Sequence, residues 1–276
     1  MATKKAATTK KASTSRKTVT TKTTKTTKPT VVAAAATTST GSSFPSFSES
    51  IRQIAFWRTL VAELVGTFLL TAVVIVGQGQ PLYILFALVG IVLLIGTVSG
   101  AYVNPALTIA AWISRRISWI RAIGYIVFQI AGALLALTVL NAFIGGAAAA
   151  DPASYSQAAA LFSAAALTDG KELYVFFAEL LGTLILGFGF ANALRGGQER
   201  LTKAFTVGLS VFVALMVAFI AASYVSATAI LNPAVAFSLN AVKWELWPLA
   251  VYILAPVIGA TAGFFLNDFL KGREAK

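Results

Sequence analysis

The tripeptide Asn-Pro-Ala occurs twice, each time at the start of a short apolar stretch, at Asn104, Pro105 and Ala106 and at Asn232, Pro233 and Ala234. Asn is a preferred N-cap residue and Pro is favoured at the first helical position, so each tripeptide predicts a helix start. Each Asn would turn its amide oxygen toward its own helix and leave its NH2 group free to donate. Two such helix starts facing one spot would suit a water molecule and repel cations.

Residue types that usually catalyse reactions or bind metals are scarce. The sequence contains no histidine and no cysteine, which removes the commonest general base, thiolate nucleophile and metal ligands together. The rest of the chain contains no recognisable nucleophile–base pair and no phosphate-binding loop. We therefore expect no enzymatic activity, no metal site and no cofactor.

The composition predicts that most of the chain faces lipid. Of its 276 residues, 57% are hydrophobic and 12% are charged, against about 25% charged in a typical soluble protein. Six apolar runs approach the roughly 20 residues that a spanning helix needs. We place them near 59–77, 81–99, 119–143, 172–193, 204–224 and 246–269.

Two further apolar runs, about 104–114 and 232–242, are too short to cross a bilayer. Short helices of this kind occur inside membranes when their ends are buried in protein or line water. We therefore expect both runs to be re-entrant half-helices that enter and leave the membrane on the same side.

The charge distribution supports this topology. With six crossings and two re-entrant segments, one side receives a large set of basic residues: Arg52, Arg58, Arg115, Arg116, Arg121, Arg195, Arg200, Lys203, Lys271, Arg273 and Lys276. The other side receives only Lys171 and Lys243, together with several acids. Because basic loops stay on the cytoplasmic side, the asymmetry predicts that both termini are cytoplasmic.

The chain also repeats itself. The pattern Ala-Glu-Leu-x-Gly-Thr occurs around Glu63 and again around Glu179, and in both halves an Asn-Pro-Ala motif follows later. Each half holds three spans, so the two copies insert with opposite orientation and share a site near the bilayer midplane. We expect an all-α membrane protein in which six transmembrane helices and two half-helices form an inverted-repeat bundle, with repeats at about 57–143 and 172–270.

Residues 1–50 differ in character from the channel-like part, 51–276. This segment is rich in Lys, Thr, Ala and Ser, and such a composition predicts a disordered cytoplasmic tail. The basic residues suit a solvated tail that helps to set topology, or a tail that binds anionic lipid headgroups. Nucleic-acid binding is disfavoured, because the tail lacks aromatic residues on which bases could stack.

Several segments resemble the aquaporin, or major intrinsic protein, family over roughly residues 57–270: SGAYVNPALT, LNPAVAFS, AELVGTFLL, RAIGYIVFQIAGALLA and YILAPVIGA. The resemblance implies a six-span, aquaporin-like hourglass fold in the plasma membrane. It also implies a pore for water or small neutral solutes in each subunit of a homotetramer. Glu63 and Glu179 match glutamates that brace the re-entrant loops through backbone N–H groups in this family. The alternative for each is a protonated glutamate that is merely packed.

The positions that match the family's selectivity filter are unusual. Val235 stands where an arginine commonly follows the second motif, and Tyr102 stands where a histidine often precedes the first. Counting from the motifs adds Ile84 and Ala229, and the fourth filter position is either Leu215 or Ile220. This apolar filter would either admit bulkier or less polar neutral solutes, or dewet and slow the passage of water.

Passive conduction of water or small neutral solutes is therefore the leading interpretation. A non-conducting structural or adhesion protein that keeps the fold is the alternative, motivated by the apolar filter and the long basic tail. An ion-coupled transporter is disfavoured, because no basic residue lies deep in the spans to pair with Glu63 or Glu179.

Overall fold

The computed structural model describes residues 47–150 and 161–272, and every regular element within them is a helix. They belong to one compact unit, Phe44–Lys276. Most of the basic tail lies outside the described residues. We expected residues 1–50 to be disordered, and this is wrong for the last residues of the tail, which belong to the helix α1 (Phe47–Arg52). The ring N–H of Trp57 donates to the carbonyl of Ile51, at 2.8 Å, and so ties the end of α1 to the next helix.

Six membrane-spanning segments follow, as predicted: α2 (Ile54–Val76), α3 (Pro81–Ile95), α5 (Trp119–Ala150), α7 (Glu172–Ala193), α8 (Arg200–Ser223) and the continuous run Leu246–Lys271. Five of them are long and apolar enough to cross a membrane. The exception, α3, has 15 residues, which span about 22 Å. Backbone hydrogen bonds continue its turns as far as Gly100, so the helical path is longer than α3 itself.

The two short apolar runs form the half-helices α4 (Pro105–Ile113) and α9 (Pro233–Ser238). We predicted a longer second half-helix, to residue 242. It ends at Ser238, and Asn240 soon afterwards takes a left-handed conformation with φ of 55°. The carbonyl of Leu239 accepts a hydrogen bond from the N–H of Ala164, at 2.9 Å, instead of continuing the helix.

The last span changes its helical type midway. It begins as α10 (Leu246–Leu249), widens into the π-helical turn η1 (Ala250–Leu254) and continues as α11 (Ala255–Lys271). Pro256 follows this turn at once, and a proline has no N–H to continue the ladder of hydrogen bonds. Tyr252 lies within the widened turn and is buried.

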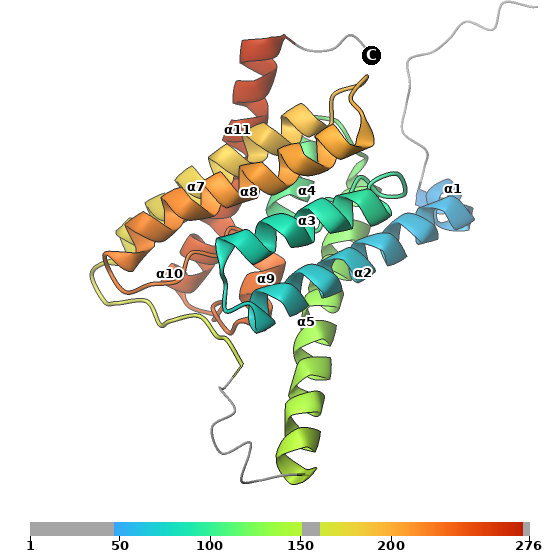
Figure 1. Cartoon of the computed structure of the whole chain (residues 1–276). Helices are drawn as coiled ribbons and strands as arrows, with labels where there is room; N and C mark the ends of the chain where they lie inside the picture. The colour runs from blue at the N-terminus through green and yellow to red at the C-terminus, as the bar shows by residue number, and fades with distance from the viewer. Residues whose placement is uncertain (1–46, 151–160, 273–276) are drawn as a thin grey trace, which may run out of the picture. The chain divides into compact units, whose positions relative to one another are not determined.

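The packing repeats the inverted symmetry seen in the sequence. In the first half α2 packs against α5, and in the second half α7 packs against α11, with α3 and α8 in contact between them (Figure 1). At the first crossing a Cβ on Gly132 would lie 2.3 Å from the carbonyl oxygen of Leu64. At the second, a Cβ on Gly259 would lie 2.2 Å from that of Leu180. Only glycine allows these helices to approach so closely.

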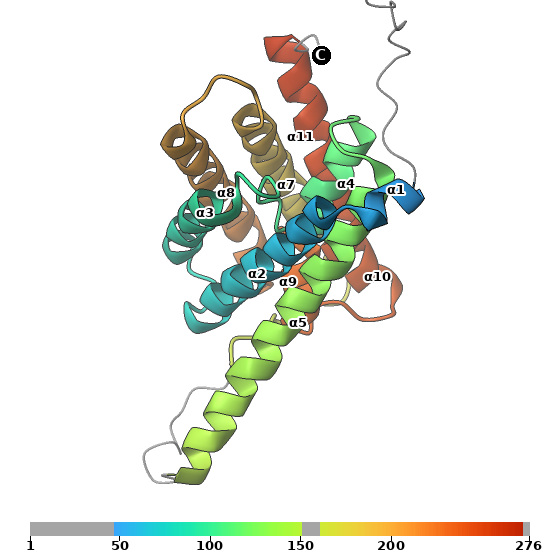
Figure 2. The same ribbon diagram turned by 90° about the vertical axis from the view of Figure 1, so that its right-hand side faces the viewer.

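Hydrogen bonds between distant segments define two faces of the bundle. On the terminus face, segments 114–118 and 194–199 meet the end of α11, for example through Arg116 and Asp268. On the opposite face, which we call the loop face, Gly79 in turn 77–80 contacts Phe162, and segment 161–171 is hydrogen-bonded to segment 224–232. The helix α5 is longer than predicted, with 32 residues, and its C-terminal part projects beyond the neighbouring helices (Figure 2).

Candidate pore

Both motif asparagines cap the helices that they precede. Oδ1 of Asn104 accepts a hydrogen bond from the N–H of Ala106, at 2.8 Å, and Oδ1 of Asn232 accepts one from Ala234, at 3.0 Å. Each Asn has an extended backbone and is followed by a proline at the first helical position. The amide oxygens therefore face their own helices, and the NH2 groups point away from them.

The two NH2 groups are engaged across the symmetry axis. Nδ2 of Asn104 donates to the carbonyl of Leu231, and Nδ2 of Asn232 donates to the carbonyl of Val103, both at 2.9 Å. We expected the NH2 groups of Asn104 and Asn232 to be free of protein partners. This is wrong, because one hydrogen of each NH2 group is bonded to a backbone carbonyl. The carbonyls are presented by left-handed residues, Val103 with φ of 42° and Leu231 with φ of 60°, which turn the peptide toward the other repeat.

The glutamates Glu63 and Glu179 each hold the loop in front of one asparagine. The carboxylate of Glu63 accepts from the N–H groups of Tyr102 and Val103, at 3.0 and 2.7 Å. The carboxylate of Glu179 accepts from those of Ile230 and Leu231, at 2.6 and 2.8 Å. Both side chains are fully buried, so these donors replace the hydration that each carboxylate lacks.

The first repeat adds side-chain donors to this arrangement. Nε2 of Gln129, on α5, donates to Oε2 of Glu63 at 2.7 Å and lies 3.0 Å from Oγ1 of Thr108, on the half-helix α4. Gln129 is fully buried, and its amide joins span, half-helix and carboxylate. The sequence analysis gave it no role, although a glutamine in the middle of an apolar span was an available signal.

A narrow cavity of about 40 Å³ connects the motifs with the filter positions. Both asparagines line it, and so do four predicted filter residues, Ile84, Leu215, Ala229 and Val235. Such a volume has room for only a few water molecules. Ile220, the alternative to Leu215, is 68% exposed on the outside of α8, whereas Leu215 is buried. The register of α8 therefore turns Leu215, and not Ile220, toward the cavity.

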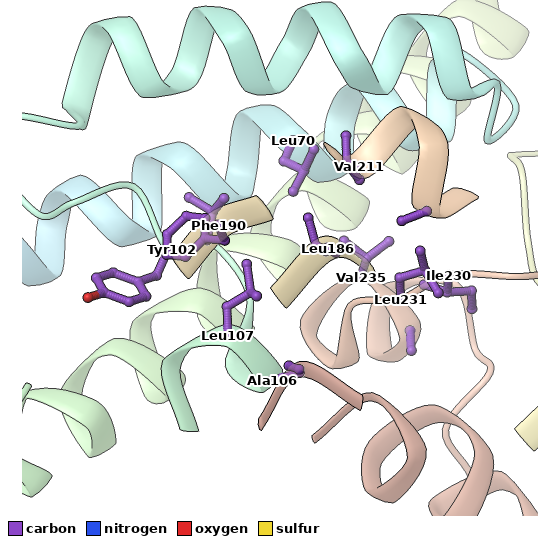
Figure 3. Close-up of a cluster of buried hydrophobic side chains, with 14 of the residues drawn as sticks. Leu70, Tyr102, Ala106, Leu107, Leu186, Phe190, Val211, Ile230, Leu231 and Val235 are labelled. Carbon is purple, nitrogen blue, oxygen red and sulfur yellow. The ribbon is translucent and has the colours of Figure 1, made fainter. Parts of the chain in front are cut away.

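The cavity wall is mostly aliphatic along its whole length. Figure 3 shows Tyr102 and Phe190 at one end of this cluster, Ile230 and Leu231 at the other, and Leu186 between them. Side chains from several elements contribute, including α2, α4, α7 and α8. Among the described residues that line the cavity, all side chains except those of the two asparagines and Tyr102 are apolar.

A second cavity, of about 210 Å³, lies toward the terminus face. Arg200 and Lys203 line it together with Phe190, and Val207 lines both cavities. Tyr102 lines the first cavity and Phe190 lines the second, and the centroids of their rings lie 5.1 Å apart. Sequence reasoning identified Tyr102 but missed Phe190, because nothing in α7 distinguishes it from its many apolar neighbours.

Comparison with known proteins decides the family. The model of the family described as "Major intrinsic protein" matches residues 50–267, well over half of the chain. The chain belongs to the major intrinsic protein family. The resemblance predicted from the motifs is therefore confirmed, and so is the predicted fold class.

Relatives of this major intrinsic protein come from bacteria and animals alike. The glycerol uptake facilitator protein-like 6 of Lactiplantibacillus plantarum is 30% identical over 219 residues, which cover 75% of this chain and 95% of that protein. The lens fiber major intrinsic protein of Ovis aries is 29% identical over 234 residues, which cover 80% and 83%. The aquaglyceroporin of Plasmodium falciparum shares the fold, with a TM-score of 0.59, 19% identity, and coverage of 79% and 97%.

Membership has direct consequences for this chain. Major intrinsic proteins are multi-pass membrane channels for water or small solutes and are not enzymes, and this chain is such a channel. In the described part of the chain, no cluster of His, Cys, Asp or Glu side chains could hold a metal ion.

Proposed function

We propose that this protein conducts water and small neutral solutes passively, through a pore centred on Asn104 and Asn232. The observation that carries the proposal is that both asparagines line one cavity, while the NH2 group of each donates one hydrogen bond to the described part of the protein. The second hydrogen of each can then donate to the oxygen of a passing molecule. A water held by both donors points its own hydrogens away from them, which breaks a continuous chain of waters.

We further propose that Ile84, Leu215, Ala229 and Val235 form the selectivity filter. All four line the same cavity and none carries a charge or a hydrogen-bonding side chain. A filter of this kind has no fixed cation to exclude other cations and no side-chain donors for a polyol. Selection there would depend on size and on the cost of stripping water from the solute.

The setting of the pore follows from the basic residues on the terminus face. We infer that both termini are cytoplasmic, because Arg116, Arg195 and Arg200 all lie at the terminus face. The plasma membrane is inferred from the family alone. We infer a homotetramer, each subunit with its own pore, from the family alone. We also propose that the basic tail, residues 1–50, contacts anionic lipid headgroups of the membrane.

Purified protein in liposomes tests the proposal by stopped-flow light scattering after an osmotic step. We expect the wild type to shrink the vesicles faster than empty liposomes, and to admit glycerol. The variant Val235→Arg should reduce glycerol permeability more than water permeability, because a guanidinium would narrow the cavity and add donors that hold water. A buried alanine away from the cavity, Ala133, provides the control variant Ala133→Val.

The alternative is a non-conducting membrane protein, favoured by the small volume of the cavity and by the apolar side chains at its filter positions. That alternative predicts permeabilities equal to those of empty liposomes for every solute, although the protein is inserted. Such a result would overturn the channel proposal.

A further inference from the structure

Two of the described residues in the wall of the narrow cavity belong neither to a helix nor to the re-entrant segments that carry the two Asn-Pro-Ala motifs. They are Gly79, in the turn between α2 and α3, and Phe162, in the segment 161–168 that precedes α7. Both lie at the loop face, whereas Tyr102 and Phe190 lie at the other end of the pore. The loop-face mouth of the cavity is therefore bounded by Gly79 and Phe162.

The two residues are in direct contact. A Cβ placed on Gly79 would lie 2.9 Å from Cζ and 3.0 Å from Cε1 of Phe162, so the ring rests on the bare backbone of the turn. Gly79 also has φ of 69°, a conformation in which other residues are strained. The ring of Phe162 thus packs against the backbone of the turn, in space that a side chain at position 79 would occupy.

The segment that carries Phe162 is tied to the backbone of the second re-entrant loop. The N–H of Ala164 donates to the carbonyl of Leu239 at 2.9 Å, and the N–H of Ala165 donates to Oγ1 of Thr228 at 2.9 Å. Farther along, Oγ1 of Thr168 donates to the carbonyl of Val225, at 3.3 Å. The ring therefore has a fixed place relative to the loop that bears the filter.

Thr228 couples this segment to the filter most closely. It immediately precedes Ala229, and its carbonyl also accepts a hydrogen bond from Oη of Tyr252, at 3.3 Å. Its side chain holds Ala165, three residues after Phe162. One residue thus links the aromatic ring, the filter residue Ala229 and the widened turn η1 of the last span.

We propose that Phe162 is a fifth, outermost wall of the selectivity filter and sets the size of solute that enters. This inference rests on the proposed channel function. The four inner positions have no polar side chains and select by size and by the cost of removing water, and a ring at the mouth adds a further limit on the width of the solute. The ring offers a π-face and no hydrogen bond, so it restricts polyols more than water.

The first test compares glycerol and water permeability of wild type and Phe162→Ala in liposomes. We expect glycerol permeability to rise about tenfold, equivalent to about 1.4 kcal/mol off its barrier, with a smaller change for water. Leu161→Ala is the matched control, because Leu161 is the adjacent, partly buried residue and does not line the cavity. An unchanged glycerol-to-water ratio in Phe162→Ala would overturn the inference while leaving the channel function intact.

A second test does not require conduction. The chain has no cysteine, so Ala229→Cys places a single thiol in the wall of the cavity that Phe162 also lines, and its reaction with a membrane-impermeant methanethiosulfonate can be timed. We expect Phe162→Ala to accelerate this labelling about tenfold, and Leu161→Ala to leave it unchanged. Faster labelling without any conduction would retain the assignment of Phe162 and reject the channel function. Equal labelling rates in both backgrounds would reject the assignment itself.

Discussion

At the scale of single residues, two buried carboxylates fix the loops that present the asparagines. Glu63 and Glu179 each accept two consecutive backbone N–H groups, and in both repeats the second of these precedes the asparagine directly. A carboxylate has two oxygens and no donor, which matches this pair of N–H groups fully. The position of each asparagine is therefore set by a side chain on the first span of its own repeat.

Replacing one oxygen by a donor should disturb this arrangement. In Glu179→Gln one N–H, of Ile230 or Leu231, would face the amide NH2 group, and leaving a buried donor unsatisfied costs about 1–3 kcal/mol. We expect a lower midpoint of thermal unfolding in detergent, and lower water permeability. Glu245→Gln is the control, because Glu245 is exposed, and an equal shift in both variants would contradict the role given to Glu179.

The sequence predicted the helix starts and the direction of both amide oxygens, because capping is local chemistry. It did not predict the bonds from the NH2 groups to the opposite repeat. Those bonds depend on left-handed backbone at Val103 and Leu231, and β-branched or bulky residues rarely adopt it. Only the long-range contacts of the folded loops hold them there.

At the scale of elements, the closest helix crossings are symmetric. Gly132 and Gly259 each meet the carbonyl of the residue that follows a loop-bracing glutamate, Leu64 or Leu180. The crossings therefore fix the spans that carry the carboxylates. The sequence does not show which glycines lie at these crossings, because composition does not show which helices touch.

We expect Gly259→Ala to lower the midpoint of thermal unfolding, because its methyl group would overlap the backbone of α7 and overpacking costs about 1–3 kcal/mol. Gly90→Ala is a matched control on another spanning helix. A Cβ there meets nothing within 4 Å, and alanine stabilises a helix interior by about 0.5–1 kcal/mol relative to glycine. Thermal unfolding of both variants in detergent checks this, and equal destabilisation would refute it.

Element boundaries were the least predictable part of the fold. The helix α5 continues to Ala150 because an alanine-rich stretch favours helix after the apolar run ends. The half-helix α9 ends where Asn240 takes a left-handed conformation and the N–H of Ala241 donates back to the carbonyl of Ala236. Segment 161–168, which carries Phe162, is distant in sequence, and no local pattern in it indicates the contact with the cavity.

At the scale of the whole molecule, the terminus face joins segments from both repeats around the end of α11. Nη2 of Arg116 donates to Oδ1 of Asp268 at 2.5 Å, and Nε of Arg195 donates to Oδ1 of Asn267 at 3.0 Å. Nη2 of Arg195 also reaches the carbonyl of Gly272, at 3.0 Å. The basic residues that indicated topology thus also hold the last span in place.

Removing the acid at the centre of this cluster should loosen the end of α11. In Asp268→Ala the two guanidinium groups lose their shared counter-charge, so we expect faster hydrogen exchange at the amides of the last turns of α11. Asp169→Ala, at the loop face, is the control. Unchanged exchange in Asp268→Ala would show that the bonds of Arg195 to Asn267 and Gly272 hold the helix without the ion pair.

The exchange of hydrogen bonds between the two asparagine loops has a consequence for the order of biosynthesis. Asn104 and its acceptor, the carbonyl of Leu231, are separated by 127 residues along the chain. At typical translation speeds, about ten seconds pass between the synthesis of the two. During that interval the first half-helix is already made, yet its asparagine has no partner from the second repeat. A nascent chain arrested before Leu231 therefore carries every residue of the first motif but only half of the centre of the pore.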